Sequence, residues 1–111
     1  MPSLKLISLN CHVPDETNLD EVYLKMEGIK VWPLSEKYQQ LPLGETLLNL
    51  SIDDISKDGT VEIELWDFDT LSRDDKLGSF VLHLDQSGKF QTEMKKHDGT
   101  GASYSLEWEY Y

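Results

Sequence analysis

Hydrophobic and polar residues alternate with a period of two along most of this chain. The clearest example is residues 60–66, in which Val61, Ile63 and Leu65 share one face and two glutamates share the other. Such alternation is typical of strands that are buried on one side. Seven segments carry it: residues 3–11, 21–27, 29–32, 46–52, 60–66, 79–85 and 103–111, with residues 90–96 as a weaker eighth. No segment sustains the helical period, so the pattern predicts an all-β protein.

Polar stretches rich in Pro, Gly, Asp and Ser separate these segments. Gly28 permits a tight turn between the second and third predicted strands. Residues 33–42 could hold a helical turn, but Pro33 and Pro42 at their ends indicate a loop. Short strands at this spacing are typical of an antiparallel sandwich or barrel. At 111 residues, the chain is expected to form a single domain over residues 1–111.

The charge balance narrows the range of partners. The chain has 10 basic and 21 acidic residues, which gives a net charge of −11. A field of that sign repels nucleic acid, and it repels anionic membranes unless a cation intervenes. The single cysteine, Cys11, excludes an internal disulfide and favours a reducing compartment. We find no signal-peptide pattern and no apolar run of the roughly 18 residues that a transmembrane helix needs, so we expect a cytoplasmic protein.

Aspartates are concentrated directly after the predicted strand at residues 60–66. The sequence there is WDFDTLSRDDKLGSF, with four aspartates within nine positions: Asp67, Asp69, Asp74 and Asp75. If consecutive strands run in opposite directions, the connections at residues 11–20 and 67–76 fall at the same end of the domain. Asp15 and Asp20 would then approach the later aspartates. Because like charges about 4 Å apart repel by about 4 kcal/mol at an effective dielectric constant of 20, we expect a cation among them.

A hard divalent cation with oxygen ligands suits these donors best. Calcium accepts roughly six to eight oxygen ligands in flexible geometry, whereas magnesium demands a tighter octahedron and retains its water ligands. Zinc is poorly served, because Cys11 and the three histidines show no metal-binding spacing. An EF-hand is excluded: its glycine position would be Ser72, its final glutamate position would be Gly78, and it needs flanking helices.

The two acidic segments carry a family resemblance. Residues 65–80 resemble the third calcium-binding loop of C2 domains, in which an apolar strand ends in W-D-x-D and the loop tip ends in another Asp. Residues 14–26 are similar to the first such loop, in which one Asp opens the loop and a second precedes an aromatic strand. The resemblance implies a C2-like β-sandwich of seven to eight strands. It also implies two calcium ions held by five aspartates: Asp15, Asp20, Asp67, Asp69 and Asp75.

The sequence departs from the C2 pattern in several places. The first loop is shorter than usual, and Glu21 and Val22 replace an expected proline. Residues 33–44 lack the N-P-x-W/F-N signature of the second loop, and the chain is shorter than most C2 domains.

Other interpretations compete with calcium ligation. The third-loop aspartates can form a solvated acidic turn in which they cap backbone N–H groups, and Asp15 and Asp20 are open to the same interpretation. Asp74 is not expected to be a ligand, because its neighbour Asp75 holds the family position. A further acidic group is expected to be a plain turn at the opposite end of the domain: Asp53, Asp54 and Asp58.

Leu19, Leu71 and Arg73 are candidate contacts for a membrane or a protein partner. The two leucines would lie at loop tips, where C2 domains often insert such residues into a bilayer, although either can equally be local packing. Arg73 and Lys76 could meet lipid phosphate beside the metal, or pair with acidic neighbours.

Two functions follow from the resemblance. The first is a calcium-binding C2-like module, a monomer that binds an anionic phospholipid surface or a protein partner through its Asp-rich loops and becomes peripheral to a membrane. The second is a protein-interaction or assembly subunit in which calcium is structural or absent. A chain that begins and ends with a strand favours this alternative, since it would be a whole small protein. An enzyme is the weakest alternative, because no nucleophile–base pair, phosphate loop or catalytic zinc pattern is present, and a carboxylate-pair hydrolase alone stays open.

Overall fold

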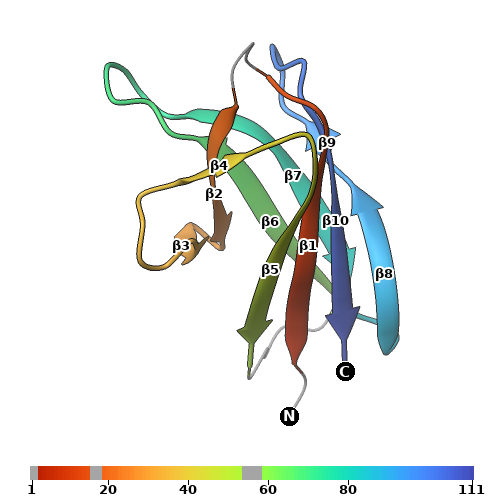
Figure 1. Ribbon diagram of the computed structural model, residues 1–111. Coiled ribbons are helices and arrows are strands. Elements are labelled where there is room, and N and C mark those ends of the chain that lie inside the picture. Colours follow the sequence, from red (N-terminus) through yellow and green to blue (C-terminus); the bar gives the residue numbers. More distant parts are fainter. Residues whose placement is uncertain (1–2, 16–18, 54–58) are drawn as a thin grey trace.

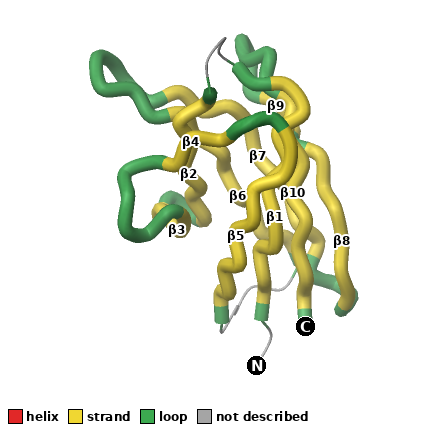
Figure 2. Tube along the Cα trace, viewed as in Figure 1, coloured by secondary structure: helices red, strands yellow, loops and turns green. Residues whose placement is uncertain are grey.

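A computed structural model describes residues 3–15, 19–53 and 59–111 of this chain. The described residues contain strands and no helix, and the strands form two antiparallel sheets (Figures 1 and 2). The strands are β1 (Leu4–Val13), β2 (Asp20–Met26), β3 (Ile29–Trp32), β4 (Gln39–Leu41), β5 (Gly44–Ile52), β6 (Thr60–Asp67), β7 (Asp75–His83), β8 (Gly88–Glu93), β9 (Lys95–Lys96) and β10 (Ser103–Tyr110). The predicted all-β antiparallel sandwich is confirmed.

The two sheets differ in width. One has the strand order β5-β1-β10-β8, and the other has the order β3-β2-β6-β7-β9, with β4 pairing with the start of β2. The start of β2, the end of β6 and the start of β7 lie together at one end of the sandwich, the upper end in Figure 1. This arrangement places the segments before β2 and after β6 next to each other.

The core lies between the sheets, and many of its residues are those that the alternation predicted to face inward; Leu41, Leu77 and Ala102 join it from outside the predicted strands. Leu24, Ile63 and Phe80 from one sheet, and Leu6 and Leu106 from the other, are completely inaccessible to solvent. Burial of a large apolar side chain of this kind contributes about 1.5–3 kcal/mol. The period-two pattern therefore predicted the packing of both inner faces.

A β-bulge explains why Ile7 and Leu9 are apolar, although a strict period of two would place them on the face opposite Leu4 and Leu6. The pairing of β1 with β10 shifts between Leu6 and Ser8, so Ile7 is an extra residue in β1. An extra residue moves the alternation by one position. Leu9 and Cys11 consequently return to the buried face.

The strands differ from the sequence prediction in three places. The weaker eighth segment, residues 90–96, forms two strands, β8 and β9, that belong to different sheets. β4 lies in the segment that two prolines indicated as a loop, and it forms because Leu41 pairs with Asp20 at the start of β2. β7 begins at Asp75 and not at Ser79, because Asp75 pairs with Asp67 at the end of β6. The loop between β6 and β7 is therefore shorter than predicted, and Asp75 belongs to a strand.

The opposite end of the sandwich joins the two ends of the described chain. Ser3 and Tyr111 exchange backbone hydrogen bonds of 2.7 and 3.0 Å, and the Ser3 hydroxyl donates to Asp53 Oδ1 at 3.0 Å. Asp54 and Asp58, which were expected to complete an acidic turn here, lie outside the described residues. Within the described part of the chain, no helix has the length and apolar character needed to cross a membrane.

Candidate functional site

The two predicted acidic segments meet at the upper end of the sandwich in Figure 1. The Glu21 N–H donates to Asp67 Oδ1 at 3.2 Å, and the Phe68 N–H donates to the Glu21 backbone oxygen at 2.7 Å. These bonds join the start of β2 to the end of β6. We call this end the acidic pole; its described residues are 15, 19–21 and 67–75.

Asp20 opens β2 and is completely buried. Its Oδ2 accepts hydrogen bonds from the Asp15 N–H at 2.9 Å and from the Tyr104 hydroxyl at 2.6 Å. Because Tyr104 belongs to β10 in the other sheet, the second bond crosses the sandwich. Burial, followed in importance by the bond to Asp20, raises the pKa of the Tyr104 phenol above its ordinary value. The rest of the fold therefore holds the Asp20 carboxylate in place.

Asp67 and Asp75 face each other across the β6–β7 pair. Asp67 is 4% exposed, whereas Asp75 is exposed at the start of its strand. Directly opposed residues of antiparallel strands have Cβ atoms about 4.5–5.5 Å apart on the same face of the sheet. The backbone thus makes immediate neighbours of two of the five predicted ligands.

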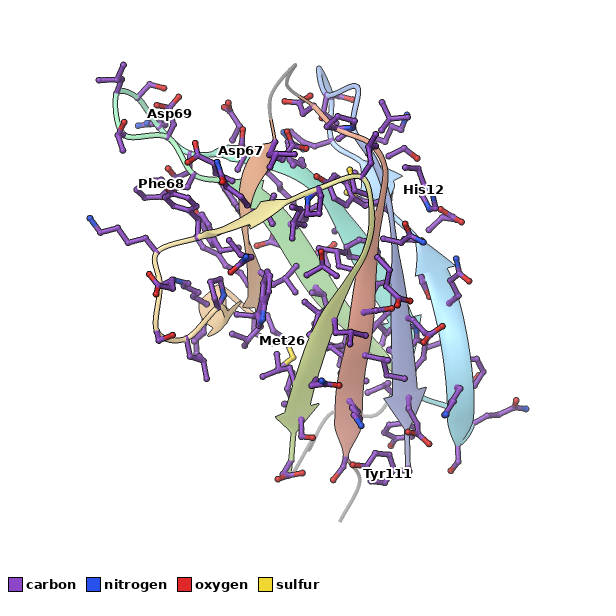
Figure 3. All side chains as sticks on the ribbon, viewed as in Figure 1. His12, Met26, Asp67, Phe68, Asp69 and Tyr111 are labelled. Carbon is purple, nitrogen blue, oxygen red and sulfur yellow. The ribbon has the colours of Figure 1, made fainter. Side chains whose placement is uncertain are left out.

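Asp69 lies in the loop that projects from the pole between β6 and β7 (Figure 3). Its Oδ1 accepts the Leu71 N–H at 2.8 Å and the Ser72 N–H at 3.3 Å, and its Oδ2 accepts the Ser72 hydroxyl at 2.8 Å. The bond from Leu71, followed by those from Ser72, lowers the pKa of Asp69. Asp69 therefore caps the turn that follows it, which is the arrangement described by the solvated-turn interpretation.

Asp74 fastens the base of the same loop. Its Oδ1 accepts the Asp69 N–H at 2.9 Å, and its Oδ2 accepts the Tyr23 hydroxyl at 2.5 Å. Burial, and then this bond to Asp74, raises the pKa of the Tyr23 phenol. Through Asp74, the projecting loop is connected to β2.

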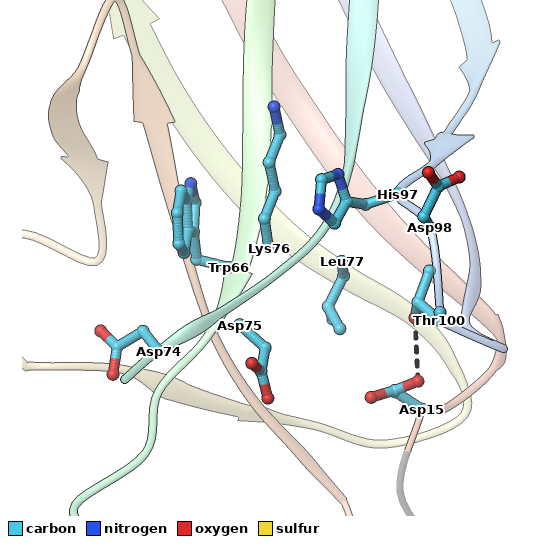
Figure 4. A pocket seen from close by; sticks show the side chains of 10 residues that line it. Asp15, Trp66, Asp74, Asp75, Lys76, Leu77, His97, Asp98 and Thr100 are labelled. Carbon is cyan, nitrogen blue, oxygen red and sulfur yellow. Dashed lines mark hydrogen bonds between the residues drawn. The ribbon is translucent and has the colours of Figure 1, made fainter. Parts of the chain in front are cut away.

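Asp15 is turned toward the connection between β9 and β10. Its Oδ1 accepts the Thr100 hydroxyl at 2.8 Å and the Gly101 N–H at 3.1 Å. A cavity of about 460 Å³ lies here, and both Asp15 and Asp75 line it together with His97 (Figure 4). Asp15 thus faces the later aspartates across an open space.

The rim of the acidic pole exposes apolar and basic side chains. Leu71 at the loop tip is 95% exposed, Leu19 is 44% exposed, and Arg73 is exposed on the same loop as Leu71. Lys76, in contrast, forms an ion pair with Glu64 at 2.9 Å, and its hydrogen bond lowers the pKa of Glu64. The three candidate contact residues, Leu19, Leu71 and Arg73, therefore lie at the surface of the acidic pole.

The predicted ligands of the acidic pole are of the type that a hard dication prefers, because all five are carboxylates. They come from the two acidic segments. In this structure, several of the side chains are turned toward hydrogen-bond donors of the protein. Among the described residues, no three His, Cys, Asp or Glu side chains are arranged so that they could hold a metal ion. The three hydrogen bonds that Asp69 accepts from Leu71 and Ser72 already use three of the roughly four lone-pair sites of its carboxylate.

The sequence pattern did not identify the tyrosines that hold carboxylates at the pole. The period of two places Tyr104 on the same strand face as Leu106, and Tyr23 on the face opposite Leu24, but it does not say where a hydroxyl binds. A usable signal existed for Tyr104, since a buried phenol normally finds a hydrogen-bond partner.

Comparison with known proteins gives matches at the level of structure. No protein-family model matches the sequence, and no curated protein matches it. A C2 domain of plant extended synaptotagmin 1 superposes with a TM-score of 0.56 at 15% sequence identity, over 98% of this chain and 92% of that one. Another solved C2 domain gives a TM-score of 0.51 at 15% identity, over 98% of this chain and 94% of that one.

The chain therefore has the fold of a C2 domain, and the C2-like sandwich expected from its loops is confirmed. At this level of identity, the likeness establishes the fold alone.

Proposed function

We propose that the chain is a non-enzymatic C2-like module that binds calcium at its acidic pole and then attaches to an anionic phospholipid surface. The observation that supports this most directly is the meeting of the two acidic segments, with the buried Asp20 and Asp67 on the neighbouring strands β2 and β6. Bound calcium would supply the positive charge that such a group of carboxylates lacks. The proposed ligands are Asp15, Asp20, Asp67, Asp69 and Asp75.

The rim of the pole supports a membrane as the target. Leu71 and Leu19 present apolar surface next to the acidic segments, and Arg73 offers a cation for a phosphate group. The net charge of −11 keeps the metal-free domain away from an anionic bilayer, so attachment would depend on the metal. The protein would then be a cytoplasmic monomer that becomes peripheral to a membrane when calcium rises.

One observation favours a second function. The Asp20 and Asp69 carboxylates accept hydrogen bonds from donors of the chain itself, Tyr104 and Ser72 among them. A pole held in this way could serve as a rigid surface for a protein partner, with calcium structural or absent. This candidate is a C2-like interaction or assembly subunit.

Thermal melts in EDTA and in about 1 mM calcium separate the two functions. A site with a dissociation constant of about 10 µM would raise the free energy of unfolding by about 2.7 kcal/mol under these conditions. Asp67→Asn combined with Asp69→Asn should abolish the shift, while the control Asp53→Asn, at the opposite end, should retain it. No calcium effect on the unmutated protein would contradict the calcium proposal and favour the interaction subunit.

Sedimentation with vesicles then tests the membrane target. We expect the calcium-loaded protein to pellet with phosphatidylserine-containing vesicles and to stay in the supernatant with neutral ones. Calcium binding without sedimentation would contradict the lipid target and point to a protein partner.

A further inference from the structure

Strand β5 forms one edge of the four-stranded sheet (Figure 1). It is nine residues long, and among the described residues no strand pairs with it on the side away from β1. Alternate residues of an antiparallel strand direct their N–H and C=O groups to opposite sides. β5 therefore presents a row of backbone donors and acceptors that a further strand can bind.

The other edges of the two sheets carry features that discourage strand pairing, such as short length, lysine and proline. β9 consists of Lys95 and Lys96 alone, and β8 contains Lys89. β3 and β4 have four and three residues, and Pro33 and Pro42 follow them directly. β5 is longer and contains no lysine, arginine or proline. It therefore has none of these three protections.

A β-bulge limits the regular edge to the first half of β5. Leu47 and Leu50, three positions apart, oppose two residues of β1 that are only two positions apart. Asn49, which lies between them, has a positive φ of 48°. Such a bulge bends the strand and interrupts regular pairing. The part of β5 that offers an uninterrupted edge is therefore residues 44–47.

Exposed apolar and acidic side chains lie beside this regular edge. Glu45 and Leu47 are two positions apart, so they share a face of the sheet. Leu47 is 62% exposed, and Leu43, just before the strand, is 66% exposed. Glu45 is exposed and forms no ion pair with any described residue. A strand added here would meet an unneutralised carboxylate next to an apolar surface.

The charge of the whole chain favours a basic occupant. The chain has 10 basic and 21 acidic residues, so two copies of it repel each other, whereas a positively charged segment is attracted. Opposite charges directly across a pair of antiparallel strands stabilise the pair, and like charges destabilise it. A cation opposite Glu45 thus agrees with both the local charge and the net charge.

We propose that β5 is a docking edge for another protein, which adds an extended segment as an antiparallel strand beside residues 44–47. The segment carries a lysine or arginine opposite Glu45 and an apolar residue opposite Leu47. Main-chain hydrogen bonds supply the affinity, and these two side chains supply the selectivity. The docking edge lies outside the acidic pole and requires no calcium, so it does not rest on the calcium-binding function proposed above.

Peptide titration in EDTA, followed by the NMR shifts of the protein amides, tests the docking edge. The probe is the peptide Thr-Val-Thr-Lys-Thr-Val-Thr, and the matched control peptide has Glu in place of Lys. At about 1 mM, the lysine peptide should shift the amides of residues 44–47 and leave those of β8 and β9 in place. It should bind about threefold more tightly than the glutamate peptide. The lysine peptide with every backbone nitrogen methylated should not bind, because it has no N–H to donate.

A charge exchange on the edge tests the selectivity. Glu45→Lys should reverse the preference, so that the glutamate peptide binds about threefold more tightly than the lysine peptide. Glu93→Lys makes the same change of charge at an exposed position of the edge strand β8, and it should leave the preference of the unmutated protein intact. The comparison separates a charge opposite the docked strand from the net charge of the domain.

The outcomes decide the inference whether or not the domain binds calcium. If the lysine peptide shifts no amide of residues 44–47, or shifts another edge strand instead, the docking edge is overturned. If Glu45→Lys still prefers the lysine peptide, the proposed chemistry of the partner is overturned. Dimerisation of the peptide-free protein with shifts at the same amides would assign the edge to a second copy and contradict the proposal. If Glu45→Lys does not fold, the preference of the unmutated protein between the two peptides decides, and equal binding overturns the proposal.

Discussion

Two carboxylates at the acidic pole, one from each acidic segment, are held in opposite ways. Asp20, in the first segment, is completely buried and accepts the hydroxyl of Tyr104 from the other sheet. Asp69, in the second, accepts its hydrogen bonds from Leu71 and Ser72 within the same loop. The two carboxylates thus have different supports: Asp20 depends on the assembled sandwich, whereas Asp69 depends on its local turn. The position of the Asp20 side chain should therefore be sensitive to changes in the core, and that of the Asp69 side chain should not.

The largest expected effect comes from deleting the buried carboxylate. Asp20→Ala should lower the free energy of unfolding of the metal-free protein by about 3 kcal/mol, because it leaves the Tyr104 hydroxyl and the Asp15 N–H without their acceptor. Urea unfolding in EDTA measures this change. Asp20→Asn retains an acceptor oxygen and should lose less. A loss below about 1 kcal/mol for Asp20→Ala would show that the fold does not depend on this bond.

Alkaline pH should also reveal how far the stability of the fold depends on the hydrogen bond between Tyr104 and Asp20. The pKa of Tyr104 is raised by burial and then by the bond to Asp20. A raised folded-state pKa favours the protonated phenol in the native state, so this contribution is present below the ordinary tyrosine pKa of 10.0 and is lost as pH rises above it. The free energy of unfolding should fall by up to about 1.4 kcal/mol per pH unit for this group.

Urea unfolding of the unmutated protein and of Tyr104→Phe between pH 8 and 11, roughly the range around the tyrosine pKa, checks the alkaline effect. The variant should be less stable at pH 8 but should lose less stability on going to pH 11. Equal slopes for the two proteins would indicate that another group titrates.

Removing the locally held carboxylate should cost less stability than removing the buried one. Asp69→Ala deletes the cap of an exposed turn, so its free energy of unfolding in EDTA should lie closer to that of the unmutated protein than to that of Asp20→Ala. Its calcium affinity should nevertheless fall, because Asp69 is a proposed ligand. A loss of stability as large as that of Asp20→Ala would contradict the contrast between Asp69 and Asp20.

The smallest change in stability is expected at the tip of the loop. Leu71 is 95% exposed, so Leu71→Ser should change the free energy of unfolding by no more than about 0.5 kcal/mol. The same substitution should reduce calcium-dependent sedimentation with anionic vesicles, because it removes apolar surface from the rim. Unchanged sedimentation would place the membrane contact elsewhere on the domain.

The sequence predicted the features that depend on local periodicity. The inward positions of Ile63, Phe80 and Leu106 followed from alternation, because burial of one face imposes a period of two on a strand. The shared end of the acidic segments followed from the reversal of consecutive strands. The bulge at Ile7 could not be predicted, since an extra residue is defined by its pairing with β10 and not by its own type.

The supports of the carboxylates were predicted unevenly, for a related reason. Capping by Asp69 was foreseen as an alternative because its donors, Leu71 and Ser72, are near in sequence. The partner of Asp20 was missed because Tyr104 lies far along the chain and reaches Asp20 only across the closed sandwich. β4 was missed because proline marks a loop in sequence, while a short edge strand can form between two prolines when a neighbour offers hydrogen bonds.

Residue-resolved calcium titration by NMR tests the central claim most directly. If both acidic segments bind the metal together, the amides of Asp15, Asp20 and Asp69 should move along one binding curve and reach saturation at the same calcium concentration. Amides near Asp53, at the far end of the sandwich, should stay in place. Movement of one segment alone, or no movement at either, would contradict the account.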